Sequence, residues 1–344
     1  MPIVYNKTPL VPQSFPGTEI RSSDSLPQVL IKYEYLQPSG SFKSRGIGNL
    51  VYQKALQIQK NSTKNPEVFS SSGGNAGYAA AVVAQKLSLP CTVVVPAATK
   101  QRMIEKIRST GAKVTIHGTF WKGADKYMKN SVLNEINTEK VEPIYVHPSD
   151  DPLIWEGNSM IVDELMESLQ EQKIDPSKVK AIVCSVGGGG LYNGLMQGLE
   201  RYKLADKIPI VGVETDGSHV FNTCLKSGKH IEFEKISTVA TSLGSASITK
   251  KTFEYAMKYR PRGVIVKDIE VLETCLRYTQ DYNMITEPAC GAAIHLAYHV
   301  DILEKALDTR LDGDDVVIII ACGGSSNSLH DMEETLKKMK SESQ

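Results

Sequence analysis

Short apolar runs alternate with longer segments of helical periodicity along most of the chain. Runs rich in valine and isoleucine, such as residues 92–95 and 316–321, are continuous rather than interleaved with polar residues. Continuous runs are typical of parallel strands buried on both faces. Strands that are separated by helices are typical of α/β proteins. Pro90 and Gly111 stand between predicted elements, where residues that interrupt regular structure are expected.

The first part of the pattern predicts strands at residues 67–70, 92–95, 113–116 and 143–146, with helices at 47–59, 76–87, 100–109 and 121–136. A helix over about 153–172 leads to the second part. There the pattern predicts strands at 180–185, 209–213, 263–266 and 315–321, with helices at 191–202, 269–282, 290 to about 306, and from 327.

This order of elements predicts an α/β protein with two domains, each containing an open, parallel, twisted sheet flanked by helices. A chain of 344 residues is long enough for about two domains. A small domain is expected at residues 46–142, inserted into a large domain formed by residues 1–45 and 143–344.

The overall composition narrows the class of protein. Basic and acidic residues are balanced, 39 against 39, which argues against a nucleic-acid binder and a polybasic membrane anchor. No apolar run reaches the roughly 18 residues that span a bilayer, and the first 30 residues contain no evident targeting signal. The six cysteines include no CxxC pair, which predicts a reduced intracellular protein. We expect a cytoplasmic protein without membrane or nucleic-acid partners; a mitochondrial location stays open.

Lys43 lies in a Ser/Gly-rich segment, PSGSFKSRG at residues 38–46, which follows an apolar run at 29–36. In an α/β protein this places the lysine at the carboxyl end of a strand, where such sheets bind ligands. A lysine amine held there can form a Schiff base with a carbonyl cofactor. Taken alone, one of 39 basic residues in a polar turn favours a solvated surface side chain.

The segment VGGGGL at residues 186–191 follows a predicted strand and opens a predicted helix. Four consecutive glycines let backbone N–H groups approach an anion, and the helix dipole adds favourable charge, so the segment predicts a phosphate site. No Gly-Lys-Ser/Thr follows, so it is not a nucleoside-triphosphate loop. A nicotinamide-dependent oxidoreductase stays open as an alternative, because Glu214 ends the next strand, although the strict G-x-G-x-x-G is missing.

Two further small-residue segments follow predicted strands. SSGGNAG at residues 71–77 can expose backbone donors to a carboxylate, with Asn75 offering an amide, but an N-capping loop explains it equally well. CGGSSN at residues 322–327 places a thiol at the end of the most apolar strand, where it could face a ring nitrogen. Taken alone, Cys322 favours a small buried thiol beside a turn.

Together these segments resemble the pyridoxal-phosphate β-family of enzymes (fold type II, similar to tryptophan synthase β), and most closely the L-serine/L-threonine dehydratases. The resemblance runs from TPL at residues 8–10 to Ser326. It includes HP at 147–148, DPLIWEG at 151–157 and EPACG at 287–291, in the family's order and approximate spacing.

The resemblance implies a role for each matching residue. Lys43 would be the Schiff-base lysine, with Phe42 beside the ring of pyridoxal 5'-phosphate. Asn75 would hydrogen-bond the cofactor's phenolic oxygen, and Cys322 would face its pyridine nitrogen. The cofactor phosphate would be held by Gly187, Gly188, Gly189, Gly190 and Leu191. The substrate carboxylate would be received by Ser72, Gly73, Asn75 and Ala76.

Glu214 and the backbone around Ser218, Val220, Leu243 and Ser245 match a monovalent-cation site of the dehydratases, for which K⁺ is the candidate ion. Ser218 and Val220 depart from the side chains of the family there. The resemblance also implies a homodimer and a small amino-acid substrate. The catalytic pattern ends near residue 328 and leaves about one helix, which predicts a catabolic form without a C-terminal regulatory domain.

The reaction that the resemblance implies is a β-elimination that deaminates L-serine to pyruvate and L-threonine to 2-oxobutyrate, each with ammonia. Serine racemase is the alternative within the family. Racemisation needs a second proton-transfer group opposite the lysine. In the racemases this group is a serine two residues before the asparagine that corresponds to Asn75. That position is Gly73, which has no side chain. The sequence therefore favours the dehydratase.

Overall fold

A computed structural model of the protein describes residues 4–16 and 26–342. The backbone divides into two compact units, one formed by Met1–Asn6 with Leu36–Asn158 and the other by Lys7–Tyr35 with Ser159–Gln344. The domain ranges expected from the sequence, 46–142 and the remainder, do not coincide with these units and stay a prediction. Each unit is described by itself.

The first unit contains a four-stranded parallel sheet with strand order β5-β4-β3-β6. Its strands are β3 (Asn65–Ser70), β4 (Cys91–Val95), β5 (Lys113–Ile116) and β6 (Val141–Val146). Its helices are α1 (Lys43–Asn61), α2 (Asn75–Lys86), α3 (Gln101–Arg108) and α4 (Trp121–Tyr127), and the first part of α5 also belongs to it. The predicted strand–helix alternation is confirmed in this unit.

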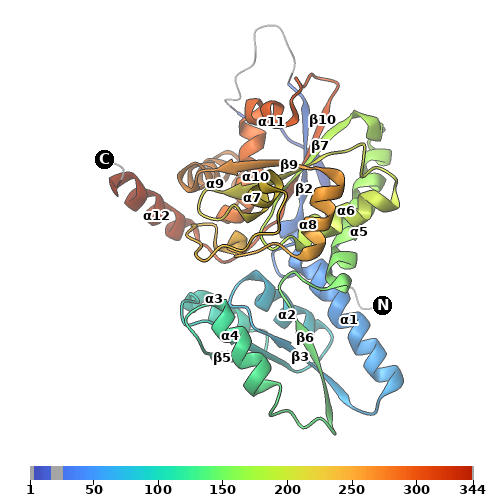
Figure 1. Ribbon diagram of the computed structural model, residues 1–344, viewed down its shortest axis with the longest axis vertical. Helices are drawn as coiled ribbons and strands as arrows, with labels where there is room; N and C mark the ends of the chain where they lie inside the picture. The colour runs from blue at the N-terminus through green and yellow to red at the C-terminus, as the bar shows by residue number, and fades with distance from the viewer. Residues whose placement is uncertain (1–3, 17–25, 343–344) are drawn as a thin grey trace. The chain divides into compact units, whose positions relative to one another are not determined.

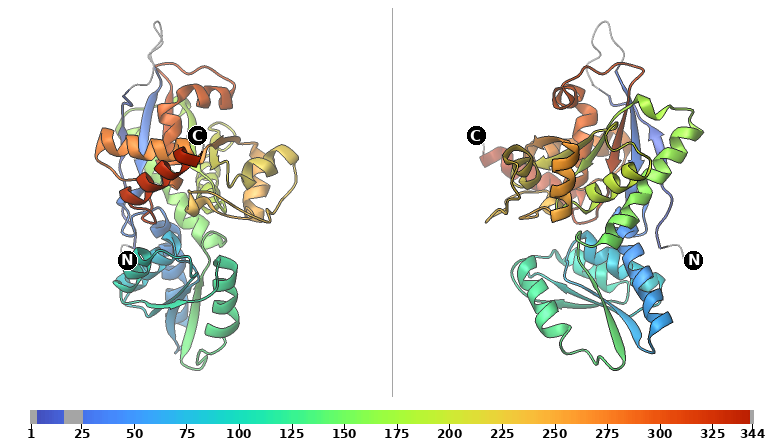
Figure 2. Two further views of the ribbon diagram at one scale, coloured as in Figure 1. Left: turned by 90° about the vertical axis from the view of Figure 1, so that its left-hand side faces the viewer. Right: turned by 45° about the vertical axis from the view of Figure 1, so that its right-hand side comes forward.

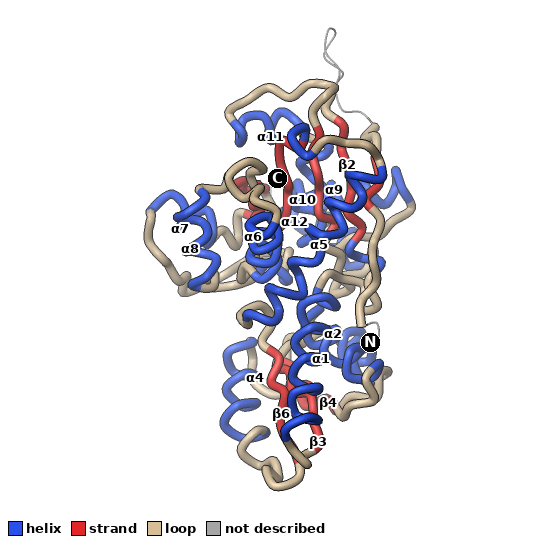
Figure 3. The backbone as a smooth tube through the Cα atoms, turned by 90° about the vertical axis from the view of Figure 1, so that its right-hand side faces the viewer, coloured by secondary structure: helices blue, strands red, loops and turns tan. Residues whose placement is uncertain are grey.

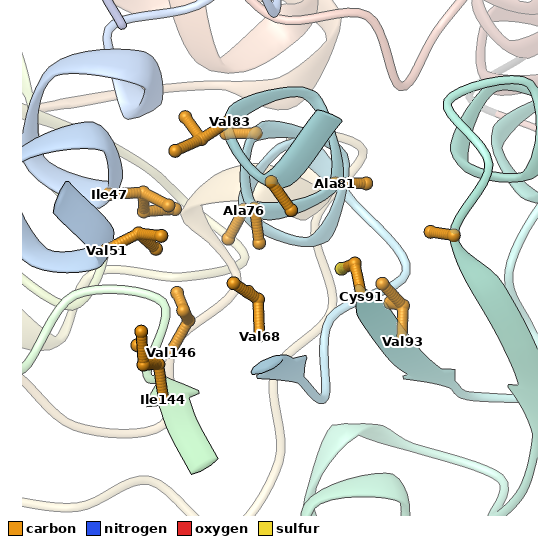
Figure 4. Close-up of a cluster of buried hydrophobic side chains, with 14 of the residues drawn as sticks. Ile47, Val51, Val68, Ala76, Ala81, Val83, Cys91, Val93, Ile144 and Val146 are labelled. Atoms are coloured by element: carbon orange, nitrogen blue, oxygen red, sulfur yellow. The ribbon is translucent and has the colours of Figure 1, made fainter. Parts of the chain in front are cut away.

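Both faces of this sheet are buried, as the continuous apolar runs predict. Along β3, Val68 joins the cluster beneath α1 and α2, whereas Phe69 points to the opposite cluster with Ala124 and Met128. This alternation follows from the two-residue period of a strand. Figure 3 shows α4 on one side of the strands and α1 on the other. Figure 4 shows the apolar side chains that fill the α1–α2 side.

The second unit contains a six-stranded sheet with strand order β1-β2-β10-β7-β8-β9 (Figure 1). Its strands are β1 (Leu10–Pro12), β2 (Gln28–Tyr33), β7 (Val179–Ser185), β8 (Ile210–Thr215), β9 (Arg262–Val266) and β10 (Val316–Ala321). All pairings are parallel except that of β1 with β2. The prediction of a parallel α/β sheet is confirmed, with one short antiparallel edge strand added.

Helices of the second unit cover this sheet, and Figure 2 gives two further views of them. They are the later part of α5 (Pro152–Glu171), α6 (Gly190–Arg201), α7 (Val220–Ser227), α8 (Lys250–Tyr259), α9 (Asp268–Tyr282), α10 (Pro288–Tyr298), α11 (Val300–Leu307) and α12 (Leu329–Glu342). A Cβ on Gly198 of α6 would lie 2.5 Å from the Val162 Cβ of α5, so glycine allows these helices to pack closely.

Three differences from the sequence prediction concern helices. The helix expected at 121–136 is α4 followed by a π-helix, Met128–Val132. The helix expected at 290–306 is interrupted at His299, whose φ of −128° is not helical. Helices α7 and α8 lie in a polar region for which the sequence predicted no helix. Within the residues that the structure describes, no helix is both long and apolar enough to cross a membrane.

Candidate active site

In the first unit, the predicted substrate segment at residues 71–77 and the turn that contacts Lys43 begin at one edge of the sheet. Ser70 of β3 pairs in register with Val146 of β6, so the chain leaves both strands side by side. Beyond β3, Ser71 begins the segment at residues 71–77, which we call the asparagine loop. His147 follows β6. Loops at the carboxyl ends of parallel strands are where α/β proteins bind ligands.

Lys43 is the first residue of α1, and its amine is held by a defined acceptor. Lys43 Nζ donates a hydrogen bond to the Pro148 carbonyl at 2.5 Å, and it lies 5.0 Å from the ring centroid of Phe42. The next turn of α1 is fastened by a hydrogen bond from Gly46 N to Asn158 Oδ1 at 3.0 Å. The lysine is therefore fixed by the turn after β6 rather than directed freely into solvent.

The asparagine loop folds tightly onto the start of α2, whose first residue is Asn75. A Cβ on Gly77 would lie 1.7 Å from the Ser72 carbonyl oxygen, so only glycine permits this approach. Ser72 Oγ accepts from Gly74 N at 3.3 Å. Within the described part of the chain, no acceptor contacts the N–H groups of Ser72 and Gly73. The loop thus offers donors that suit a carboxylate, and its binding of the substrate carboxylate stays a prediction.

Asp125 supports the asparagine loop, a role that no motif in the sequence predicts. Its Oδ1 accepts from Ser71 Oγ at 2.7 Å and from Tyr145 OH, and its Oδ2 pairs with Lys129 Nζ at 2.8 Å. Burial raises the pKa of Asp125, but the hydrogen bonds from Lys129, Tyr145 and Ser71 outweigh it and hold the pKa below its ordinary value. A charged Asp125 therefore fixes Ser71, where the loop begins.

In the second unit, the glycine segment forms the turn between β7 and α6. Gly189 has a φ of +97°, and a Cβ there would lie 1.9 Å from Thr252 Oγ1, so both backbone geometry and space demand glycine. Within the described residues, no acceptor contacts the N–H groups of Gly187, Gly188 and Gly189. These donors and the N-terminus of a 12-residue helix form an anion site.

The start of α8 braces this glycine turn. Thr249 N donates to the Gly188 carbonyl at 3.0 Å, and the Thr249 hydroxyl accepts from Asn193 Nδ2 at 3.0 Å. Thr252 Oγ1 in turn donates to Asn193 Oδ1 at 2.9 Å. Because the bracing residues come from about 60 positions later in the chain, the sequence pattern alone did not identify them.

Cys322 follows β10, which pairs with β7, so the thiol and the glycine turn begin at the same edge of the sheet. A hydrogen bond with the Cys290 side chain, together with burial, raises the pKa of Cys322 well above 9.0. The thiol is therefore neutral at pH 7. The turn after it is tight, because a Cβ on Gly324 would lie 1.9 Å from Glu287 Cδ.

Glu214 ends β8 and is only 2 % exposed. Its carboxylate accepts hydrogen bonds from Phe221 N at 2.9 Å and Asn222 N at 2.8 Å, in the first turn of α7. Burial raises the pKa of Glu214 to about 7, although these hydrogen bonds act in the opposite direction. Glu214 thus joins α7 to the sheet, a contact that the sequence did not predict.

Two of the other residues predicted for a cation site contact each other. Ser218 Oγ donates to the Leu243 carbonyl at 3.1 Å, and a Cβ on Gly187 would lie 3.2 Å from Leu243 Cα. Val220 begins α7, and Ser245 Oγ donates to the Ser247 carbonyl at 2.6 Å. Among the described residues, no group of three or more His, Cys, Asp or Glu side chains could hold a metal ion. A cation here would depend on carbonyl oxygens in addition to the Glu214 carboxylate.

Comparison with known proteins identifies the class that this fold and these loops define. Residues 3–323 match the family model of the pyridoxal-phosphate dependent enzymes, and the chain belongs to this family. The predicted resemblance is confirmed, and the cofactor is pyridoxal 5'-phosphate. The nicotinamide alternative for the glycine turn is not supported.

Individual relatives are similar to the chain over nearly its whole length. It is 60 % identical over 340 residues to the catabolic L-serine/threonine dehydratase of Saccharomyces cerevisiae, covering 99 % of this chain and 93 % of the relative. The crystal structure of a fungal L-serine ammonia-lyase from Rhizomucor miehei has a TM-score of 0.82 and 32 % identity, covering 97 % and 99 % of the two chains. Maize serine racemase, with a TM-score of 0.77, 20 % identity and coverage of 97 % and 94 %, shares the fold.

The residues present fit the cofactor. Three unpaired N–H groups at a helix N-terminus suit a phosphate, and side chains at Gly187 and Gly189 would obstruct that turn. A neutral thiol at Cys322 suits an uncharged ring nitrogen. Lys43 supplies a primary amine at a helix start. These observations agree with the family model, which spans all of these positions.

Proposed function

We propose that the protein is an L-serine/L-threonine ammonia-lyase, which converts L-serine to pyruvate and L-threonine to 2-oxobutyrate, each with release of ammonia. The observation that carries this proposal is the 60 % identity over nearly the whole chain to a catabolic L-serine/threonine dehydratase. Membership of the pyridoxal-phosphate dependent family supports it.

In this proposal the cofactor is held by residues in defined surroundings. Lys43, beside Phe42, would hold the cofactor through its aldehyde, and the backbone donors of residues 187–191 would bind its phosphate. Asn75 would bind the phenolic oxygen. Cys322, as a neutral thiol, would face the ring nitrogen without charging it. The cofactor supplies electron withdrawal from the substrate α-carbon when bound.

The protein residues orient the substrate and move its protons. The donors of the asparagine loop, in Ser72, Gly73, Asn75 and Ala76, receive the substrate carboxylate. The free Lys43 amine would take the α-proton at Nζ, and the Pro148 carbonyl would accept a hydrogen bond from the resulting ammonium. A neutral Cys322 would not stabilise a protonated ring nitrogen as a carboxylate would, so electron withdrawal by the ring would be weaker. This favours prompt elimination of the β-hydroxyl over transamination.

A direct assay tests the proposed function. Purified protein with pyridoxal 5'-phosphate is expected to form equal amounts of ammonia and pyruvate from L-serine, and of ammonia and 2-oxobutyrate from L-threonine. Each product is measured separately, and chiral chromatography follows D-serine. Release of neither keto acid, or D-serine as the main product, would refute the proposal.

The proposal includes a monovalent cation held by Glu214 and the carbonyls around Ser218, Val220, Leu243 and Ser245. A buried carboxylate is costly unless hydrogen bonds or a cation compensate for its charge. Potassium chloride is therefore expected to raise the melting temperature of the cofactor-free protein above that in tetramethylammonium chloride. The expected difference is about 1–2 °C if cation binding contributes about 1 kcal/mol and the 344-residue chain unfolds as one unit. In Glu214→Gln the difference should disappear. Equal melting temperatures and activities in both salts would count against the cation.

The proposal also extends to a cytoplasmic homodimer acting on a small amino acid. The homodimer is supported by the resemblance to the dehydratases, and an intracellular location by six cysteines that include no CxxC pair. Light scattering of the purified protein measures the mass in solution, and fractionation of cells distinguishes the cytoplasm from mitochondria.

A further inference from the structure

The turn after β6 is fixed by the imidazole of His147. His147 Nδ1 accepts hydrogen bonds from two backbone donors, Asp150 N at 2.8 Å and Ser149 N at 3.2 Å. Both partners can only donate, so Nδ1 must carry its lone pair. The ring is therefore neutral, with its proton on Nε2.

The surroundings of His147 keep this neutral form. Burial lowers the pKa of His147 below 6.5, and the charges of Lys43 and Lys129 act in the same direction. Asp150 and Asp125 oppose this shift without reversing it. Protonation of Nδ1 would also break both hydrogen bonds to the turn. The imidazole thus acts as a fixed acceptor at neutral pH.

Two carbonyl oxygens of the turn accept hydrogen bonds from side chains of neighbouring helices. The Pro148 carbonyl accepts from Lys43 Nζ at 2.5 Å, and the Ser149 carbonyl accepts from Trp155 Nε1 at 2.7 Å. The ring of Trp121 meets the His147 ring edge-on, with centroids 5.6 Å apart. The imidazole, the turn and the lysine amine therefore form one connected arrangement.

We propose that His147 is a positioning residue for Lys43: its Nδ1 fixes the turn so that the Pro148 carbonyl lies where the lysine amine can donate to it. The inference rests on the proposed function, in which Lys43 takes and returns a proton. A carbonyl that accepts from an ammonium forms a charge-assisted hydrogen bond. Loss of this acceptor misplaces the amine and weakens its protonated form.

Two amide substitutions distinguish the roles of the two ring nitrogens of His147. In His147→Asn the side-chain oxygen lies two bonds from Cβ, as Nδ1 does, and can accept from the backbone two residues on. In His147→Gln the amide reaches the position of Nε2 instead. We expect kcat to fall less than about threefold in His147→Asn and about 10–100-fold in His147→Gln, with KM nearly unchanged. Thermal unfolding verifies that both variants fold.

Cofactor-free protein provides readouts that do not depend on turnover. Nitrogen-15 spectra of labelled histidine are expected to show an unprotonated Nδ1 and a protonated Nε2 for His147. Acetylation of Lys43, followed by mass spectrometry, is expected to be faster in His147→Gln than in the unmodified protein and in His147→Asn. Lys60, an exposed residue near the end of the same helix, is the internal control for reactivity.

Several outcomes would overturn the inference: equal losses of kcat in both variants, no loss in either, an Nδ1-protonated ring, or unchanged acetylation of Lys43. If the unmodified protein released no keto acid from serine or threonine, the proposed function would fail. The tautomer and the acetylation rates would still decide whether His147 positions Lys43.

Discussion

Replacing Lys43 by alanine is expected to reduce release of pyruvate from L-serine to below about a thousandth of the original rate. The substitution removes both the amine that bonds the cofactor and the base that takes the α-proton, and positioned proton transfer alone contributes about 10²–10⁴-fold. The protein should still fold, because the substitution changes only one side chain, at the first residue of α1. Keto-acid release, visible absorbance with added cofactor and the melting temperature are measured together.

Lys43→Arg is the matched control for charge. Arginine keeps the positive charge and can donate to the Pro148 carbonyl, but it stays protonated and cannot act as base or nucleophile. It should be as inactive as Lys43→Ala while retaining the cofactor-free melting temperature. Borohydride reduction and peptide mapping of the unmodified protein locate the lysine that bonds the cofactor. A pyridoxyl group on another lysine would show that the assignment is wrong.

The sequence predicted most strands of the two sheets. The features that it did not predict are very short or depend on contacts between residues far apart in the chain. Strands such as β4 and β10 are continuous apolar runs, which only a sheet covered on both faces accommodates. Strand β1 has three residues, one of them proline, which is too short for any pattern. Lys32 in β2 is fully buried because it pairs with Glu164 at 2.6 Å, 132 residues later. No local pattern reveals such a partner.

For the candidate site, the sequence predicts the glycine-rich turns but not the residues that support them. Glycine-rich turns after strands carry a local signal, since backbone donors near an anion leave no space for side chains. The residues that support these turns carry none. Asp125 reaches Ser71 from 54 positions away, and Thr252 fills the space beside Gly189 from 63 positions away. Their identity depends on tertiary packing, so sequence reasoning could name the donors but not what holds them.

The contact between Thr99 and Gly73 allows the choice between dehydration and racemisation to be tested by substitution. It lies between β4 and α3, and a Cβ on Gly73 would lie 2.1 Å from Thr99 Oγ1 and 2.8 Å from Thr99 Cγ2. The backbone of Gly73 is not in the left-handed region, so serine is compatible with its conformation. The obstacle to a serine hydroxyl at this position is therefore the side chain of Thr99.

Gly73→Ser alone is expected to lower the free energy of unfolding by about 1–3 kcal/mol, as overpacking does, and to form little D-serine. Gly73→Ser combined with Thr99→Gly removes the clashing atoms and should recover much of that loss. A hydroxyl at position 73 could then serve as the second proton-transfer group, so the double variant should form D-serine at the expense of pyruvate. Thr99→Gly is the control and should keep forming pyruvate. Chemical denaturation gives the stabilities, and chiral chromatography of the serine reaction gives the products. Abundant D-serine from the unmodified protein would refute the argument, because that protein has no side chain at position 73 to deliver the second proton.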